Sequence, residues 1–272
     1  LGSRSTAIGK SALSSQNFTS ATNSYNTALG YEAGKAVTTG INNTLIGGLA
    51  GDAITTANDN VAVGKGSLTA DTTGAENTAV GNVTLAFNTT GASNAAFGYG
   101  ALYANTTASN NTAIGYLSLA ANTTGAGNTA VGLSALGANT TGAGNAGLGM
   151  EALYTNTTGA ANVGLGQQAL YSNTTASSNT AIGFQTMYNN TTGTANTAVG
   201  RAALVANTEG DYNSAYGMNS LKANTEGNYN VSMGYESLQA NTTGASNTAI
   251  GMYAGKFKTT ASNNTAVGYS AL

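Results

Sequence analysis

The side chains that most often carry out chemistry in enzymes are scarce in this sequence. Its 272 residues include no histidine, cysteine, tryptophan or proline, which removes the imidazole base, the thiolate nucleophile and the cysteine-based metal site. Eight basic and ten acidic residues give a net charge of −2, so no basic surface is available for nucleic acid or an anionic membrane. We therefore expect no enzyme activity, no cofactor, no metal and no nucleic-acid partner.

The remaining candidates for acid/base or ligand chemistry all have simpler explanations. Glu209, Asp211 and Glu226 could form a carboxylate pair or a calcium site, but no calcium-binding consensus surrounds them, and a solvated rim is predicted. Residues 147–152 and 164–169 match the G-x-G-x-x-A pattern of dinucleotide-binding loops. They lack the strand–helix context that such loops need, so no nucleotide site is predicted.

Tyrosine provides the best candidate for a contact site. Tyr103, Tyr154, Tyr171 and Tyr188 occupy the same place in a repeat, the last three in consecutive copies, so we expect an aromatic stripe. Aromatic side chains are good contacts for sugars and protein partners. The four tyrosines are therefore a possible ligand-contact stripe, and the alternative is that they only cover a thin core.

Two polar patterns raise further alternatives. Threonine pairs such as Thr106-Thr107 could form hydroxyl ladders suited to ice, although a flat two-column array needs Thr-x-Thr. Asn-Thr-Thr is formally a glycosylation acceptor, but asparagine is also a preferred turn residue. The acceptors of this kind are Asn88, Asn105, Asn122, Asn139, Asn156, Asn173, Asn190 and Asn241.

A repeat of seventeen residues contains all of these side chains. Its consensus is Asn-Thr-Ala-(Val/Ile)-Gly-x-x-Ala-Leu-x-Ala-Asn-Thr-Thr-Gly-Ala-x, whose residues we number as positions 1 to 17. Sixteen copies make residues 1–272 a single repeat array, with one four-residue insertion between Gly9 and Gly30. The position-5 glycines are Gly9, Gly30, Gly47, Gly64, Gly81, Gly98, Gly115, Gly132, Gly149, Gly166, Gly183, Gly200, Gly217, Gly234, Gly251 and Gly268.

The residues tolerated at each position predict its environment. Position 4 is always apolar and position 9 is usually leucine, so both are expected to be buried, with the β-branched position 2 facing the same interior as position 4. The invariant glycine at position 5 indicates a corner with positive φ or a close approach. The asparagines at position 1 are expected to stack as a ladder.

A glycine-rich unit of this length excludes helical repeats and predicts an all-β fold. We expect a parallel β-solenoid or β-roll of sixteen coils with 17 residues and about two short strands per coil. At ~4.8 Å per coil the rod would be roughly 75 Å long. Because so thin a core is sparse, we also expect a homo-oligomer in which the small residues at positions 3 or 8 pack between chains.

The segments Asn111–Leu119 and Asn179–Met187 carry a resemblance to a known family. Asn-Thr-Ala-Ile-Gly-x-x-Ala-Leu resembles the head repeats of trimeric autotransporter adhesins, and it is also similar to repeats of phage tail fibres and of trimeric bacterial fibre proteins. The resemblance covers about nine residues of each copy and implies a left-handed, homotrimeric β-roll. This chain departs from the family in having a longer unit and no heptad stalk or membrane anchor.

These patterns predict an extracellular fibre or adhesin segment, located at a cell or virion surface, that provides a rigid repetitive rod for multivalent attachment. Its expected partners are further copies of itself, most simply as a trimer, and surface glycans or proteins of another cell, with no membrane insertion in this segment. Because neither terminus has a polar cap, we expect the chain to be an excerpt of a longer fibre. The alternatives are a structural filament subunit, a virus tail-fibre shaft without its own receptor, and an ice-binding solenoid.

Overall fold

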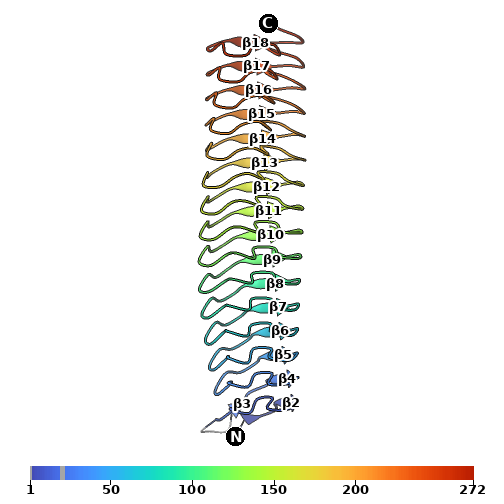
Figure 1. Cartoon of the computed structure of the whole chain (residues 1–272), viewed down its shortest axis with the longest axis vertical. Helices are drawn as coiled ribbons and strands as arrows, with labels where there is room; N and C mark the ends of the chain where they lie inside the picture. Colours follow the sequence, from blue (N-terminus) through green and yellow to red (C-terminus); the bar gives the residue numbers. More distant parts are fainter. Residues whose placement is uncertain (1, 19–21) are drawn as a thin grey trace. The chain divides into compact units, whose positions relative to one another are not determined.

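The computed structural model describes residues 2–18 and 22–272, and this part of the chain contains β-strands but no helix. Two strands of two residues lie near the N-terminus, and the others have three residues that match positions 2–4 of a repeat (Figure 1). The strands are β1 (Gly2–Ser3), β2 (Thr6–Ile8), β3 (Thr22–Asn23), β4 (Thr27–Leu29), β5 (Thr44–Ile46), β6 (Val61–Val63), β7 (Thr78–Val80), β8 (Ala95–Phe97), β9 (Thr112–Ile114), β10 (Thr129–Val131), β11 (Ala146–Leu148), β12 (Val163–Leu165), β13 (Thr180–Ile182), β14 (Thr197–Val199), β15 (Ser214–Tyr216), β16 (Val231–Met233), β17 (Thr248–Ile250) and β18 (Thr265–Val267).

The chain forms two compact units, residues 1–134 and 135–272. In the first unit β2 and β4 to β10 pair in sequence order, and in the second β11 to β18 do the same; every pair is parallel. Within a unit each residue pairs with its equivalent in the next copy, as Ala79 pairs with Ala96. Both units are therefore parallel β-solenoids with about 17 residues per coil, as the sequence predicts.

Each coil contains one strand of the main sheet rather than the two that the sequence suggested. Positions 7 and 9 have left-handed backbone, with φ of 53° at Leu117 and 49° at Leu119, so a strand cannot form across positions 7–9. Its N–H groups still bond to neighbouring coils, as when Leu117 donates to the carbonyl of Tyr99 at 3.0 Å. The inter-coil hydrogen bonding therefore continues through turns as well as strands.

The interior of each coil is built from positions 3, 8 and 9, which corrects the expectation for positions 2 to 4. Ala113 at position 3 and Leu119 at position 9 have no exposed surface, whereas Ile114 at position 4 is 42 % exposed. Neighbouring strand residues point to opposite faces, so positions 2 and 4 share the outer face. The leucine column is confirmed as core, but the position-4 column is not, and positions 3 and 8 are too deeply buried to pack between chains.

Small residues occupy position 3 because the space between the strand and the position-9 leucines is narrow. A Cβ atom added to Gly147 at position 3 would lie 3.3 Å from Cγ of Leu136, a position-9 leucine, so a large side chain at both places does not fit. Leu45 is the one large residue at position 3. Cβ atoms added to the position-9 glycines Gly34 and Gly51 would lie 2.7 and 2.8 Å from its δ carbons, so their missing side chains make room for it.

The position-5 glycine column confirms the predicted corner. Gly115 has φ of 137°, and an added Cβ would lie 2.4 Å from the carbonyl oxygen of Gly132. Positive φ and backbone-to-backbone approach both require glycine here. The column therefore sets how closely successive coils can stack.

The predicted asparagine ladder at position 1 is confirmed, and a second ladder runs at position 12. At position 1, Asn94 donates its backbone N–H to Oδ1 of Asn77 at 3.0 Å. At position 12, Asn105 Nδ2 donates to Oδ1 of Asn88 at 2.8 Å and to the carbonyl of Ala108 at 3.0 Å. The sequence showed the position-12 asparagines only as turn residues, and their ladder role was missed.

Candidate interaction surfaces

The outer face of the sheet presents a large apolar side chain at position 4 in coil after coil. We call positions 2, 4 and 6 the outer apolar face, because position 6, just beyond the glycine corner, is often apolar as well. The exposed large members are Ile8, Leu29, Tyr31, Phe97, Tyr99, Ile114, Tyr116 and Leu133 in the first unit and Leu148, Met150, Val163, Leu165, Phe184, Tyr216, Met218, Met233, Ile250, Met252, Val267 and Tyr269 in the second. Soluble monomers rarely expose contiguous apolar surface of this kind, so the face has the character of an interface.

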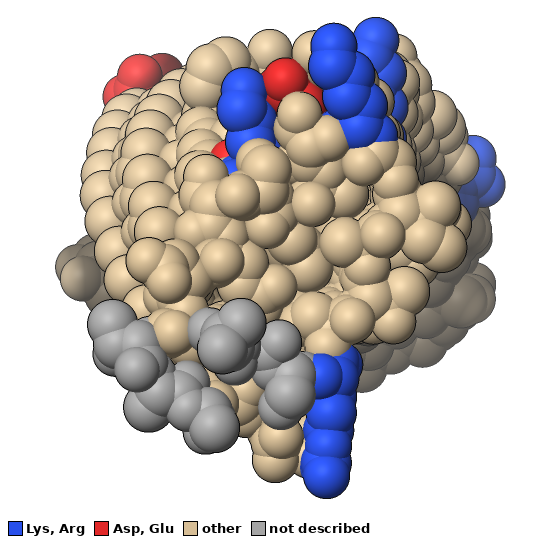
Figure 2. Space-filling view, turned by 90° about the horizontal axis from the view of Figure 1, so that it is seen from below, with Lys and Arg blue, Asp and Glu red and all other residues tan. Residues whose placement is uncertain are grey.

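Charge is sparse on the surface that surrounds this face. Figure 2, a view from below, shows acidic and basic side chains at only a few places among the uncharged ones. Residues 77–150 contain no charged residue at all. In the described part of the chain, ion pairs form only between Lys35 and Glu32 (3.1 Å) and between Lys256 and Glu236 (2.7 Å). Contacts made by most of the surface must therefore use apolar groups, hydroxyls and amides.

The structure brings three of the four stripe tyrosines together. The rings of Tyr154 and Tyr171 stack with centroids 5.4 Å apart, and those of Tyr171 and Tyr188 stack at 4.9 Å with an interplanar angle of 3°. Tyr103 lies in the other unit and instead meets Phe87 edge to face at 4.9 Å. Because both faces of Tyr171 are covered by its neighbours, this stack offers a partner ring edges and hydroxyls rather than a central ring face.

An amide ladder at position 7 occupies the same coils as this stack. Gln168 Nε2 donates to Glu151 Oε2 at 2.9 Å, and Gln185 Nε2 donates to Oε1 of Gln168 at 2.9 Å. Partial burial raises the pKa of the Tyr171 hydroxyl, and the nearby charge of Glu151 raises it further. The hydroxyl therefore stays protonated at neutral pH and can donate a hydrogen bond to a polar ligand.

Two further tyrosine stacks were not found from the sequence. Tyr99 and Tyr116 stack at 5.4 Å at position 6, and Tyr212 and Tyr229 stack at 5.2 Å at position 17. The signal that could have found them is the same as for the stripe, since each pair is two tyrosines one repeat apart. Stacked tyrosines are thus a recurrent surface feature rather than a mark of one site.

The carboxylates considered for chemistry line neither of the two surface pockets described below. Glu209 and Glu226 are exposed. Asp211 Oδ1 instead accepts hydrogen bonds from the backbone N–H and the hydroxyl of Thr194, at 2.6 and 3.0 Å. Across the described ranges, no group of three acidic side chains is placed to hold a metal ion.

The threonine pairs and the Asn-Thr-Thr asparagines are used inside the turns. The first threonine of a pair is half-buried, and the Oγ1 of Thr106 donates to the carbonyl of Thr123 at 3.1 Å. The second threonine, as at Thr107, is exposed, so each unit has one exposed threonine column at these turns rather than two. All eight acceptor asparagines are fully buried, which leaves their amides inaccessible to a glycosylating enzyme in the folded chain.

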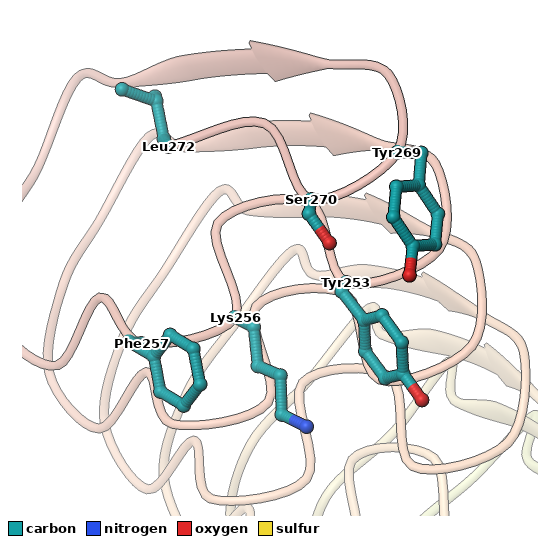
Figure 3. Close-up of a pocket in the computed structure, with 6 residues that line it drawn as sticks. All are labelled: Tyr253, Lys256, Phe257, Tyr269, Ser270 and Leu272. Carbon is teal, nitrogen blue, oxygen red and sulfur yellow. The ribbon is translucent and has the colours of Figure 1, made fainter.

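Two surface pockets occur at aromatic residues. One of about 360 Å³ is lined by Tyr253, Lys256, Phe257, Tyr269, Ser270 and Leu272. Figure 3 shows the Lys256 side chain between the rings of Phe257 and Tyr253, and its ammonium group lies 4.4 Å from the Tyr253 ring centre. The second, of about 270 Å³, is lined by Val83, Tyr99, Gly100, Tyr103 and Leu117. The charge of the first is already paired with Glu236, and the second is lined mainly by apolar groups.

No protein-family model matches this chain, and no curated protein matches it significantly. The described residues include no helix long and apolar enough to cross a membrane. Function must therefore be argued from the surfaces themselves.

Proposed function

We propose that the chain is a segment of an extracellular, homotrimeric fibre whose copies associate through the outer apolar face. The observation that carries the proposal is the exposed apolar side chain at position 4, repeated along each solenoid unit. Full burial of an exposed side chain of this size contributes about 1.5–3 kcal/mol, so covering the two-fifths of Ile114 that is exposed contributes roughly 1 kcal/mol. The repeat multiplies this contribution along the chain. The role is structural and attachment-related rather than catalytic.

The trimeric state comes from the resemblance to adhesin head repeats, and the proposed interface comes from the burial pattern. Rotational symmetry brings the same face of each copy to a common axis, where three apolar columns enclose a dry interior. The positions first expected at the interface, 3 and 8, are instead inside each coil. Left-handed coiling belongs to the same proposal and rests on the resemblance.

Native mass measured by sedimentation equilibrium tests the assembly. The chain is 26.7 kDa, so a trimer has a mass of 3 × 26.7 = 80.1 kDa. We expect that mass at both low and high salt, because position 4 carries no charged residue and position 6 only three, Lys10, Lys65 and Arg201, and salt screens only charges. A monomer would contradict the proposal, and open-ended growth of mass would favour the filament alternative.

Attachment is proposed to use the surfaces left outside the trimer, with the tyrosine stripe as the contact and surface glycans or proteins of another cell as the partner. Repetition supports this assignment, since many weak contacts on one rigid rod produce strong overall binding. At a cell or virion surface, such a rod would hold two bodies together.

A glycan array probed with the intact fibre and with Tyr171→Ala tests the stripe. Removing the central ring breaks both stacks but leaves the buried leucine column untouched, so the melting temperature should change little and glycan binding should fall at least tenfold. Tyr229→Ala, which breaks an unrelated tyrosine stack, is the matched control. Equal binding by the parent and Tyr171→Ala would remove the stripe from the proposal.

A further inference from the structure

The position-12 ladder contains one acidic residue, Asp71, among its asparagines. Asp71 has no exposed surface, and its Oδ1 accepts hydrogen bonds from Gly74 N–H at 3.1 Å and from Asn88 Nδ2 at 3.0 Å. Its second oxygen, Oδ2, is buried without a hydrogen-bond partner. A buried carboxylate oxygen in this situation is strongly unfavourable while it carries charge.

The geometry of the ladder shows what this oxygen replaces. In the next coil Asn88 uses Oδ1 to accept from Asn105 and Nδ2 to donate to the carbonyl of Gly91 at 2.9 Å. Since Asp71 Oδ1 has the role of the asparagine oxygen, Oδ2 takes the place of Nδ2 and faces the carbonyl of Gly74. Two carbonyl-type oxygens repel each other unless one of them carries a proton.

The Gly74 carbonyl has room for such a donor. The equivalent carbonyl of Gly91 accepts from both Asn77 and Asn88, each at 2.9 Å. Among the described residues, the carbonyl of Gly74 accepts only from Asn60, at 2.9 Å. A protonated Asp71 would supply the missing second hydrogen bond and reproduce the asparagine pattern.

We propose that Asp71 is a pH-dependent switch of the first unit, which we call the latch. The protonated carboxyl stabilises the packing of the neighbouring coils, and the ionised carboxylate weakens it. The position suits this role because Asp71 is the first polar residue of the position-12 ladder. The equivalent residue one coil earlier is the fully buried Ile54, so no acceptor of that residue opposes Oδ2. A carboxyl at Asn105 would instead place an oxygen against Oδ1 of Asn88.

In the described part of the chain, no charged side chain compensates the negative charge of an ionised Asp71. Burial raises the pKa of Asp71 to about 7, and the hydrogen bonds from Gly74 and Asn88 lower it by less. Its neighbours in the ladder are Ile54, one coil earlier, and Asn88, one coil later, and neither side chain titrates. Because the folded pKa lies above the unfolded value, the stabilisation is complete below about pH 4 and is lost as the pH rises through 7.

Hydrogen exchange followed by mass spectrometry on the full chain tests the latch, with Asp71→Asn as the matched variant that carries a permanent donor. We expect amides of residues 68–91 to exchange equally in both proteins near pH 4. In the parent alone, opening should increase about tenfold per pH unit from there to pH 7. Asp59→Asn, which removes an exposed carboxylate one coil earlier, should behave like the parent. Identical pH profiles for the parent and Asp71→Asn would overturn the proposal.

Discussion

Asparagine is the residue on which each coil depends for its internal polar contacts. Asn173 at position 12 donates to Oδ1 of Asn156 at 2.8 Å and to the carbonyl of Ala176 at 3.0 Å, and its own Oδ1 accepts from Asn190 at 3.0 Å. All three groups lie out of contact with water, where an unsatisfied donor or acceptor costs about 1–3 kcal/mol. A primary amide is the one side chain that can donate twice and accept in this geometry.

Replacing Asn173 with alanine should therefore lower stability by about 2–5 kcal/mol. The change leaves Oδ1 of Asn156 without its donor and one N–H of Asn190 without its acceptor, and it removes one of the two hydrogen bonds to the Ala176 carbonyl. Thermal unfolding followed by circular dichroism measures the loss. Thr175→Ala, at an exposed position of the same turn, should change the free energy of unfolding by less than about 0.5 kcal/mol. Equal effects of the two substitutions would show that the ladder contributes nothing special.

At the scale of the element, each strand separates an inner face of small residues from an outer face of large ones. In β9, Ala113 is fully buried while its neighbour Ile114 is two-fifths exposed. The inner face lies against the position-9 leucines, where backbone and side chain already fill the space. The large residues thus lie on the side where a partner, rather than the chain itself, would cover them.

Two substitutions of neighbouring residues in β9 distinguish the faces. Ala113→Leu should destabilise each chain by about 1–3 kcal/mol through overpacking against the leucine column. Ile114→Asp should leave the fold of the single chain close to normal, yet reduce the native mass from that of the trimer to that of the monomer, because the aspartate would be buried unpaired at the interface. Unfolding and sedimentation measurements on both variants check this, and a stable Ala113→Leu or a trimeric Ile114→Asp would contradict it.

The repeat length, the glycine corner, the leucine column and the first asparagine ladder could all be predicted, because each depends on contacts between equivalent residues of neighbouring coils. The inner face could not be predicted from hydrophobicity, which assigns large apolar residues to the interior of a single chain. A subtler signal was present in the sequence: Leu45, the one large residue at position 3, occurs between glycines at 34 and 51. The latch was missed because Asp71 looks like an ordinary turn residue until its burial is known.

At the scale of the whole molecule, sixteen nearly identical copies could pair in the wrong order during folding. A strand could pair with a copy one repeat away and keep every side chain on its correct face, because the alternation of faces would be preserved. The exceptions to the consensus remove this freedom within the first unit. Leu45 fits only beside the glycines at 34 and 51, and Asp71 fits best next to Ile54, so these coils have a defined sequence of neighbours.

The glycine column also governs how the gene of such a protein can change in length. Because each position-5 glycine touches the backbone of the next, as Gly98 touches Gly115, an inserted segment must restore that contact one coil later. Equivalent residues are 17 apart, so a whole unit corresponds to 17 × 3 = 51 nucleotides. Recombination between copies in steps of that size would lengthen or shorten the array without disturbing a single stacking contact, whereas a step of any other size would interrupt the 17-residue spacing of those contacts. Selection can therefore adjust the reach of the molecule in discrete increments.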